Sequence, residues 1–442
     1  MSFFRPSSLL PRLKPLSAKR SSIFTVLDIG SSKVVCMIGR LTPVEAAEVL
    51  SGRTHSIEIL GIGHQKSRGL KAGVIADIEA VESSVRLAVD AAERMAGLTV
   101  ESLIVNVTAG RLISETHSAA VNLGGHEVTP ADLKKVVGAA TRQSQLNERA
   151  ILHSLPAGYV LDGERGVRDP LGMYGDALGV DMHVLTADRA PLKNLELSVN
   201  RAHLTVEAMV ATPYASGLAA LVSDEAEMGC AAIDMGGGTT TISVFAEGKL
   251  VHADAVALGG QHVTMDLARG LSTRLEDAER IKVVHGSALP HASEDRDIIS
   301  VPPIGDDDRD QPVQVPRGLV ARIVRARVEE TLEMIRDRIQ QSGYSSIVGK
   351  RIVLTGGASQ LTGINESARR IIARNVRIGR PLGVSGLPAA AKGPAFSTAV
   401  GLMIYPQVSH LETHGAGEGG MSAMTGAGGR LANVGRWLKD SF

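Results

Sequence analysis

Two stretches of this chain place an aspartate, followed by glycines and small hydroxyl residues, at the end of an apolar run. They are residues 25–33, TVLDIGSSK, and residues 231–241, AAIDMGGGTTT. Glycine lets the backbone approach a ligand closely, and successive N–H groups in such a turn can bind an anion. The carboxylates of Asp28 and Asp234 lie where each could hold a hydrated divalent metal. Together the two turns predict a phosphate chain that is bound from two sides.

Either stretch alone is more typical of a strand that runs into a turn, so the prediction depends on further features of the second half. A third glycine turn, Gly356 and Gly357, follows an apolar strand at 351–354 and leads into a helix N-terminus, which favours an anion. Glu279 and Lys282 are three residues apart on one helical face, which suits contacts with a ribose and a base. Taken alone, these two residues are better explained as a solvent-exposed helix pair.

The composition excludes several classes of function. The 442 residues hold 47 Lys and Arg against 47 Asp and Glu, so no overall field attracts nucleic acid. Cys36 and Cys230 lie in apolar runs, which indicates buried thiols rather than a disulfide, and no cysteine spacing is typical of a metal site. No run approaches the ~18 apolar residues of a membrane-spanning helix. The first 22 residues are basic and contain no acid, which indicates a disordered tail.

The elements that position these turns follow a strand-rich order with one interruption. From residue 23 to about residue 110 we expect three strands, a helix at 78–96 and a strand at 102–108. Residues 111–189 break this rhythm with a strand pair and a helix that Thr129 and Pro130 open, which indicates an inserted α+β unit. Further helices are expected at 190–202, 214–224, 264–286 and 320–339. A strand pair flanks residues 306–308, three aspartates that we interpret as a solvated loop rather than a metal site.

The glycine turns and the Glu279–Lys282 pair, in their order along the chain, resemble the actin/Hsp70/sugar-kinase superfamily. Motifs of the inserted unit resemble the FtsA family of bacterial cell-division proteins: ILHSLP at 151–156, LDG at 161–163, DPLGM at 169–173 and NL at 194–195. The resemblance covers residues 23–442. It implies an α/β, actin-like fold in which two similar halves surround a nucleotide cleft, with an inserted α+β subdomain typical of the FtsA family.

We therefore divide the chain into a disordered basic tail and six further parts. The first actin-like core subdomain is formed by residues 23–109 and 190–228, and residues 110–189 form the inserted subdomain. The second core subdomain is formed by residues 229–257 and 346–408, and residues 258–345 form its outer subdomain. The tail is residues 1–22, the flexible linker is residues 409–429, and the C-terminal helix is residues 430–442.

The resemblance implies that ATP and Mg²⁺ bind in the cleft. One side of the phosphates would be met by Gly30, Ser31, Ser32 and Lys33, and the other by Gly236, Gly237, Gly238, Thr239 and Thr240. Asp28 and Asp234 would hold the metal through water. The ribose and base would contact Glu279 and Lys282, and the adenosine would contact Gly356, Gly357 and Ala358.

One departure from the superfamily concerns hydrolysis. Its polymerising ATPases place a Glu or Gln at the turn after the first half, where it orients the attacking water. Here that turn, residues 211–217, reads ATPYASG and has no carboxylate or amide. We therefore expect tight ATP binding with weak or no hydrolysis, and assign no catalytic residue.

The C-terminal segment has the pattern of a membrane-surface helix. Residues 409–429 include seven glycines, which indicates a flexible linker. At about 100° per residue, the apolar side chains of the last thirteen residues fall within an arc of roughly 140°. These membrane-facing residues are Leu431, Val434, Trp437, Leu438 and Phe442. Packing of this face onto the protein's own body is the alternative, and the flexible linker argues against it.

The resemblance implies an actin-like division protein that polymerises at the inner face of the cytoplasmic membrane, at the division site, as a peripheral membrane protein. It would bind the FtsZ C-terminal tail and so tether FtsZ, recruit later division proteins through the inserted subdomain, and bind no nucleic acid. On the helix at 320–339, Arg322, Arg325 and Arg327 could form a basic face for the FtsZ tail, or simply a solvated face. An adaptor of pilus assembly and a small-molecule kinase are the alternatives.

Overall fold

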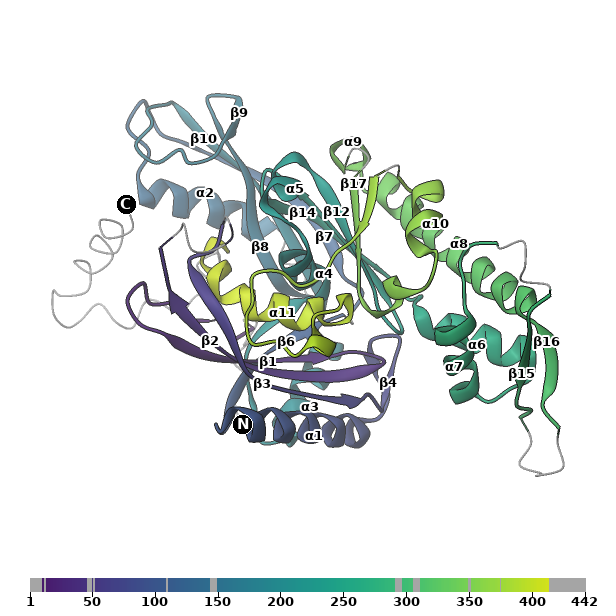
Figure 1. Ribbon diagram of the computed structural model, residues 1–442. Coiled ribbons are helices and arrows are strands. Elements are labelled where there is room, and N and C mark those ends of the chain that lie inside the picture. Colours follow the sequence, from purple (N-terminus) through teal and green to yellow (C-terminus); the bar gives the residue numbers. More distant parts are fainter. Residues whose placement is uncertain are drawn as a thin grey trace, which may run out of the picture.

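The computed structural model describes residues 10–412 apart from residue 12, 46–49, 51, 109, 144–148, 291–295, 305–310, 349–350 and 374 (Figure 1). The predicted linker from residue 413 onward, the C-terminal helix at 430–442 and the acidic tip at 306–308 therefore lie outside the described residues. The elements of the described part form two five-stranded sheets, a four-stranded sheet and two strand pairs. No helix of this described part is long and apolar enough to cross a membrane.

The first half is built on a sheet in which β1 lies at the centre. The strand order is β11-β6-β1-β2-β3. Strands β1, β6 and β11 are parallel, β2 is antiparallel to β1, and β3 is antiparallel to β2. The bounds are β1 (Ser22–Ile29), β2 (Lys33–Pro43), β3 (His55–Lys66), β6 (Ser102–Val107) and β11 (Thr205–Ala211). Helices α1 (Ile78–Ala96) and α3 (Arg189–Arg201) cover its outer face, below the sheet in Figure 1.

The second half repeats this arrangement with the same strand directions. Its strand order is β14-β13-β12-β17-β18, with β12, β17 and β18 parallel, β13 antiparallel to β12, and β14 antiparallel to β13. The bounds are β12 (Cys230–Met235), β13 (Thr240–Ala246), β14 (Lys249–Val256), β17 (Arg351–Thr355) and β18 (Asn375–Ile378). Both cysteines are buried and form no disulfide, as predicted.

Two helices join the halves. Helix α4 (Thr212–Ala220) follows the last strand of the first sheet but packs on the second sheet, and α11 (Ser397–Ile404) follows the second sheet but packs on the first. They contact each other at Gly401, where an added Cβ would lie 1.7 Å from the carbonyl oxygen of Ala215. The smallest residue is therefore required for this close approach.

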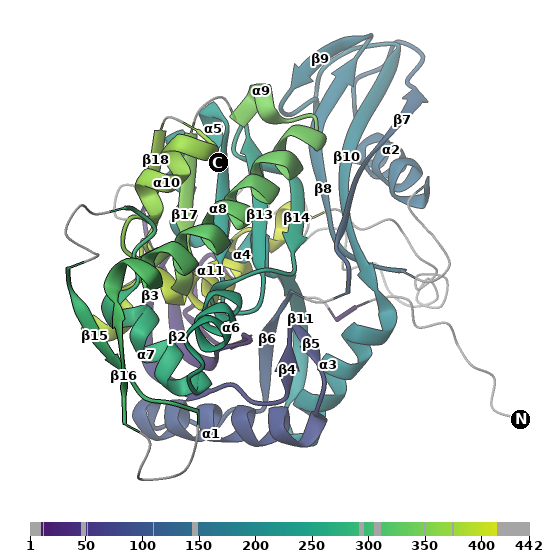
Figure 2. The ribbon, with the colours of Figure 1, turned by 90° about the vertical axis from the view of Figure 1, so that its right-hand side faces the viewer.

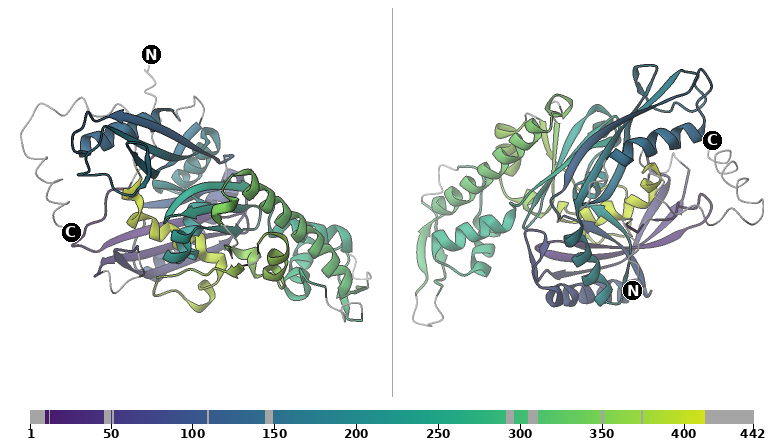
Figure 3. Two further views of the ribbon diagram at one scale, coloured as in Figure 1. Left: turned by 90° about the horizontal axis from the view of Figure 1, so that it is seen from above. Right: turned by 180° about the vertical axis from the view of Figure 1, so that it is seen from behind.

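The inserted subdomain is a four-stranded antiparallel sheet with one helix on it. The strand order is β7-β10-β8-β9, and α2 (Pro130–Gln143) packs on β7 and β10. The strands are β7 (Ile113–Asn122), β8 (Arg149–Leu161), β9 (Glu164–Val167) and β10 (Ala177–Asp188). Figure 3 shows this subdomain and the outer subdomain of the second half extending from opposite sides of the molecule.

The outer subdomain differs in one element from the prediction. The helix expected at 264–286 is two helices, α6 (Gly260–Leu271) and α7 (Leu275–His285), because the chain adopts a left-handed conformation at Ser272. The long helix α8 (Arg317–Gln341) buries its apolar face against the second sheet, in front of which it runs in Figure 2. The expected strand pair is present as β15 (Ile298–Val301) and β16 (Val313–Pro316).

The remaining elements are short. A hairpin of β4 (Leu70–Lys71) and β5 (Val74–Ile75) has no counterpart in the predictions. The helix expected at 214–224 divides into α4 and α5 (Ser223–Met228). The second half also contains α9 (Ser345–Val348), α10 (Ile364–Ile371) and the 3₁₀ helices η2 (Gly357–Gln360), η3 (Ala389–Ala391), η4 (Pro394–Phe396), η5 (Tyr405–Gln407) and η6 (Ser409–Leu411).

The described part of the N-terminal segment, residues 10–22 apart from residue 12, differs from the disordered tail that the charge of residues 1–22 suggested. Leu10, Leu13 and Leu16 pack against the core of the first half. The ring of His55 lies 3.2 Å from the carbonyl oxygen of Ser17. Burial of the three leucines therefore holds this part of the tail on the molecule, while the basic side chains of Lys14 and Lys19 stay exposed.

Candidate functional site

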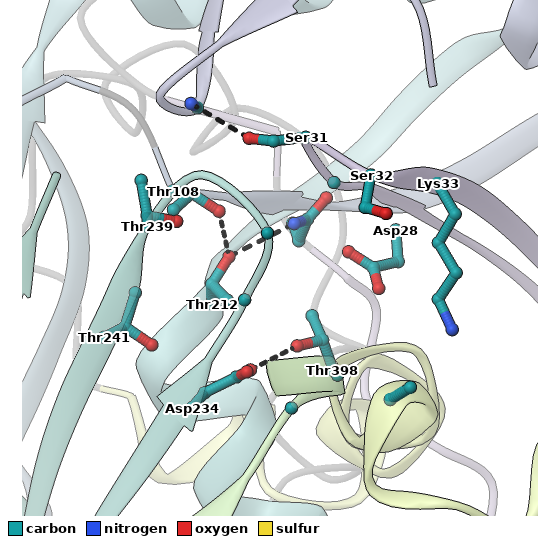
Figure 4. Close-up of a pocket in the computed structure, with 18 of the residues that line it drawn as sticks. Asp28, Ser31, Ser32, Lys33, Thr108, Thr212, Asp234, Thr239, Thr241 and Thr398 are labelled. Atoms are coloured by element: carbon teal, nitrogen blue, oxygen red, sulfur yellow. Dashed lines mark hydrogen bonds between the residues drawn. The ribbon is translucent and has the colours of Figure 1, made fainter. Parts of the chain in front are cut away.

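A cavity of about 800 Å³, including the open space at its mouth, lies between the two halves (Figure 4). Eleven of the sixteen predicted ligand residues line it: Asp28, Gly30, Ser31, Ser32, Lys33, Asp234, Gly236, Gly237, Thr239, Gly356 and Gly357. It is also lined by Ile29, Gly73, Asn106, Thr108, Thr212, Thr241, Pro394, Ala395 and Thr398.

The two predicted turns have the same geometry. The Gly30 N–H donates to the carbonyl oxygen of Lys33 at 3.0 Å, and the Gly236 N–H donates to that of Thr239 at 2.9 Å. Each turn joins the central strand of its sheet to the next, β1 to β2 and β12 to β13. The two stretches that share the aspartate–glycine pattern therefore form turns with the same backbone hydrogen bond.

The turns meet across the cavity. A Cβ added to Gly238 would lie 2.6 Å from the Ser31 hydroxyl, so the second turn approaches the first where only glycine fits. The Gln261 amide donates to the carbonyl oxygen of Ser31 at 2.9 Å. The tip of the β4–β5 hairpin joins them, because the Gly73 N–H donates to the Ser31 hydroxyl at 3.3 Å. Backbone groups of both halves are thus brought to one space.

The two aspartates are buried, and their carboxylates lie on two sides of that space in Figure 4. Burial raises the pKa of Asp28 to about 7. The positive charge of Lys33 opposes this increase, and the negative charge of Asp234 adds a smaller increase. Burial also raises the pKa of Asp234, against hydrogen bonds such as that from the Thr398 hydroxyl at 2.8 Å. Two desolvated carboxylates facing one space suit a bound cation, whose charge would favour their ionised form.

These carboxylates fit a hydrated metal rather than a directly bound one. Within the described part of the chain, no group of three or more His, Cys, Asp and Glu side chains could hold a metal ion. Mg²⁺ keeps several of its waters and is bound through one or two carboxylates together with phosphates. Asp28 and Asp234 would supply those carboxylates, and phosphates would supply the rest.

Lys33 lies beside Asp28 in Figure 4 and lines the cavity, and its amino group contacts an aromatic ring. Its Nζ lies 3.3 Å from the centre of the Phe396 ring, a cation–π contact. Burial lowers the pKa of Lys33 to about 8, although Asp28 and Asp234 both oppose this. A bound phosphate would provide the negative charge that favours the protonated amine.

Five predicted residues do not line the cavity. Gly238 lies at the contact between the turns, and the Thr240 hydroxyl donates to the carbonyl oxygen of Leu258 at 2.8 Å, inside the protein. Lys282 donates to Glu279 at 2.7 Å and to the carbonyl oxygen of Gly260 at 3.1 Å. Ala358 also lies close to Gly260: a Cβ added to Gly260 would be 3.2 Å from the Ala358 methyl group and 3.6 Å from Nζ of Lys282. Glu279, Lys282 and Ala358 therefore lie together beside the cavity.

Five polar cavity residues were missed from the sequence: Thr241 and Thr398 of the second half, and three of the first half, Asn106, Thr108 and Thr212. The side-chain oxygen Oδ1 of Asn106 accepts from the Ile29 N–H at 2.7 Å, and its side-chain nitrogen Nδ2 donates to the Thr212 hydroxyl at 3.1 Å. The Thr108 and Thr212 hydroxyls are 2.6 Å apart. All three residues lie at the carboxyl ends of parallel strands, where open α/β sheets bind ligands, and that position was the available signal.

Comparisons with known proteins establish the family. A family model described as "Cell division protein FtsA" matches residues 231–401, and one described as "SHS2 domain inserted in FTSA" matches residues 109–186. A "Cell division protein FtsA" from Rhizobium meliloti (strain 1021) is 76% identical over 443 residues, covering 100% of both chains. The chain belongs to the FtsA family. A relative of the same name from Escherichia coli (strain K12) is 31% identical over 94% of this chain and 97% of its own length.

Solved structures place the FtsA-family chain in the actin-like fold. The "PilM-PilN type IV pilus biogenesis complex" aligns with a TM-score of 0.58 and 14% identity, over 87% of this chain and 98% of the other. MreB5 of Spiroplasma citri bound to ADP aligns with a TM-score of 0.50 and 14% identity, over 88% and 97%. Both likenesses concern the fold alone. The predicted family and fold class are confirmed, and a cell-division role takes the place of the pilus-adaptor and kinase alternatives.

Proposed function

We propose that this FtsA-family protein binds ATP with Mg²⁺ in the cleft, polymerises on the inner face of the cytoplasmic membrane and tethers FtsZ there. The proposal rests above all on one observation: two aspartate–glycine turns with the same backbone hydrogen bond face one cavity from the two halves. Family membership supports the division role, and the ADP complex of the distantly similar MreB5 supports a nucleotide in this position.

The assigned roles follow from position. Backbone N–H groups of the two turns bind the phosphates, and Asp28 and Asp234 hold the hydrated Mg²⁺, which neutralises phosphate charge. Gly356 and Gly357 leave room for the adenosine, and Glu279, Lys282 and Ala358 reach it from beside the cavity. Hydrolysis is slow or absent, because Thr212 lies at the turn where a water-orienting Glu or Gln would be needed.

The remaining partners are proposed from the sequence. The helix at 430–442 binds the membrane surface, and the outer subdomain at 258–345 binds the FtsZ C-terminal tail. The inserted subdomain, whose edge strand β9 lies at the end away from the first sheet in Figure 1, contacts later division proteins. Self-assembly into filaments brings many copies of the helix to one membrane.

Gly357→Glu tests the nucleotide assignment. An added Cβ at Gly357 would meet only the Ala395 methyl group, at 3.8 Å, so the backbone accepts a side chain that then enters the cavity. Its carboxylate would repel the phosphates, and we expect affinity for a fluorescent ATP analogue to fall by about 100-fold or more.

The matched control is Gly158→Glu in β8. A Cβ at Gly158 has nothing within 4 Å, and the residue belongs to the inserted subdomain, so the same chemical change should leave ATP affinity as in the parent. Equal affinity in the parent and Gly357→Glu would remove ATP from this cavity.

A further inference from the structure

The side chain of Glu412 is buried at the base of the C-terminal segment. It is the last described residue and lies within the predicted linker at 409–429, yet its side chain is only 1% exposed. It faces His153 of the inserted subdomain, whose side chain is 0% exposed, and Oε1 lies 2.8 Å from Nδ1 of that ring. A buried carboxylate is costly unless it is paired, so this contact holds the segment on the protein body.

The other ring nitrogen of His153 fixes where the ring hydrogen lies. The backbone N–H of Ala211 points at Nε2 from 2.9 Å. Because a backbone N–H can only donate, Nε2 must accept and carry no hydrogen. The hydrogen of the neutral ring is therefore on Nδ1, and it is donated to Glu412. The carboxylate thus sets the tautomer that leaves Nε2 available for Ala211.

Ala211 connects this contact to the cavity. It precedes Thr212, which opens α4 and lines the cavity. The Thr212 hydroxyl accepts from the Asn106 amide at 3.1 Å, and Asn106 accepts from the Ile29 N–H at 2.7 Å. Ile29 lies between Asp28 and Gly30 of the first turn. A connected set of polar contacts, which we call the relay, therefore joins the first turn to Glu412 at the start of the C-terminal segment. Its members are Ile29, Asn106, Thr212, Ala211, His153 and Glu412.

Packing keeps the His153 ring in one orientation. The Tyr214 ring lies 5.0 Å from it and the Tyr405 ring 5.8 Å from it, both edge to face. Both tyrosines are buried, and Tyr405 belongs to η5, which directly precedes the Glu412 segment. The ring cannot turn without moving α4 or η5, so a change at either end of the relay is transmitted through a rigid contact.

We propose that Glu412, acting through His153, is a positioning residue for the Ala211–Thr212 turn of the cavity, and that it couples the attachment of the C-terminal tail to nucleotide binding. The coupling rests on the proposed nucleotide site. It is reciprocal: a nucleotide that orders the turn holds Glu412 in place, and a docked Glu412 favours the nucleotide. The position of Glu412 and the state of the cavity then depend on each other, although the C-terminal segment does not contact the ligand.

The first test needs no nucleotide. In the full chain, Glu412→Leu replaces the carboxylate with an apolar side chain of similar size and so removes the acceptor for the Nδ1 hydrogen. Glu412→Gln retains an acceptor oxygen. Hydrogen exchange in the peptide that contains Ala211 should become about 10-fold faster or more in Glu412→Leu and remain as in the parent in Glu412→Gln. Equal exchange in all three proteins, or equal acceleration in both variants, would overturn the relay.

The second test measures the coupling. Parent and Glu412→Gln should show ATP·Mg²⁺ slowing exchange at residues 405–412, and Glu412→Leu should lose that protection and bind ATP about 5- to 50-fold more weakly. Glu58→Gln, an exposed carboxylate of β3 paired with Arg40, is the matched control and should behave as the parent. Unchanged ATP affinity and protection in Glu412→Leu would overturn the coupling. If the parent itself binds no ATP, the proposed function fails, while the nucleotide-free exchange still decides the relay.

Discussion

Asp28 and Asp234 occupy matching positions in the two halves but have different surroundings. Asp234 accepts a hydrogen bond from Thr398, and a Cβ at the neighbouring Gly356 would lie 2.2 Å from its carboxylate, so Gly356 is needed to fit it. Gly356 also has a φ of +85°, which glycine adopts readily. Asp28 instead has Lys33 as its main favourable charge. The pKa of Asp28, about 7, makes it the carboxyl that titrates near neutral pH.

Asp28→Asn should stabilise the nucleotide-free protein more at high pH than at low pH. Since the folded pKa of Asp28 is about 7 and its ordinary value is 3.8, the ionised form disfavours folding. That penalty is absent below about pH 4, grows between pH 4 and 7 and is constant above. Three pKa units correspond to at most about 4 kcal/mol. Urea unfolding at pH 5 and pH 8 should therefore show a larger gain in unfolding free energy from the substitution at pH 8.

The control for this experiment is Asp90→Asn on the exposed face of α1. Its effect on unfolding free energy should be small at both pH values. A gain from Asp28→Asn that is the same at pH 5 and pH 8 would contradict the raised pKa of Asp28.

Residues of the candidate site differed in how far they could be predicted. The aspartates and glycines of the turns stand out because glycine placed after an apolar strand and an acid has few structural explanations. Asn106, Thr108 and Thr212 stand in separate segments, and ordinary polar residues after a strand carry no signal until the sheet order brings the strand ends together. The Glu412–His153 contact joins residues 259 positions apart, which no local pattern could indicate.

At the scale of elements, periodicity predicted long helices well and their interruptions poorly. The apolar positions of α8 are buried as its spacing predicts. The break between α6 and α7 was missed because residues 272–274 include no glycine or proline. A tertiary contact accompanies the break instead: the Thr273 hydroxyl donates to the carbonyl oxygen of Pro302 at 2.6 Å. Such a contact is formed only in the folded outer subdomain.

The structure separates the roles of two arginines on α8. Arg327 pairs with Asp266 of α6 at 2.6 Å, a half-buried contact that joins two helices, and with Glu330 of its own helix at 2.5 Å. Arg327→Glu should therefore lower the unfolding free energy, by about 1–3 kcal/mol, because it places like charges together. Arg325→Glu should instead weaken binding of an FtsZ tail peptide without loss of stability.

Thermal unfolding and peptide titration of the two single variants check this division. Equal stability of Arg327→Glu and the parent would contradict the structural role of Arg327. Parent-like peptide binding by Arg325→Glu would remove this face of α8 from the proposed FtsZ interface. ATP affinity should be unchanged in Arg325→Glu and serves as the control.

Trp437→Glu tests the C-terminal helix, which lies outside the described residues and remains a prediction. The substitution places a charge at the centre of the apolar arc, so the protein should no longer sediment with liposomes. Asn433→Glu adds the same charge outside the arc and should retain binding. Both variants should bind ATP as the parent does. Continued sedimentation of Trp437→Glu would show that another segment attaches the protein to the membrane.

At the scale of the whole molecule, the two halves share their interior helices. Because α4 and α11 each pack on the sheet of the other half, a ligand that contacts both turns can bias how the halves are arranged. The relay extends this connection to His153 of the inserted subdomain and to Glu412 at the start of the C-terminal segment. The cleft is therefore placed to influence every part of the molecule that we propose for partner binding.

Weak attachment of single molecules fits this design. Five apolar side chains of the helix at 430–442 contribute at most ~1.5–3 kcal/mol each, less the cost of ordering the helix. One copy should bind a membrane weakly, and a filament that presents many copies should bind well through effective concentration. Membrane binding by the purified protein should therefore depend on assembly, and assembly on ATP.

Sedimentation with anionic liposomes, with and without ATP·Mg²⁺, tests this central claim most directly. The parent protein should sediment with liposomes when ATP·Mg²⁺ is present and stay largely in the supernatant without it, whereas Gly357→Glu should stay in the supernatant in both conditions. Equal sedimentation of the parent with and without ATP would contradict the account, because the cleft would then have no part in bringing the protein to the membrane.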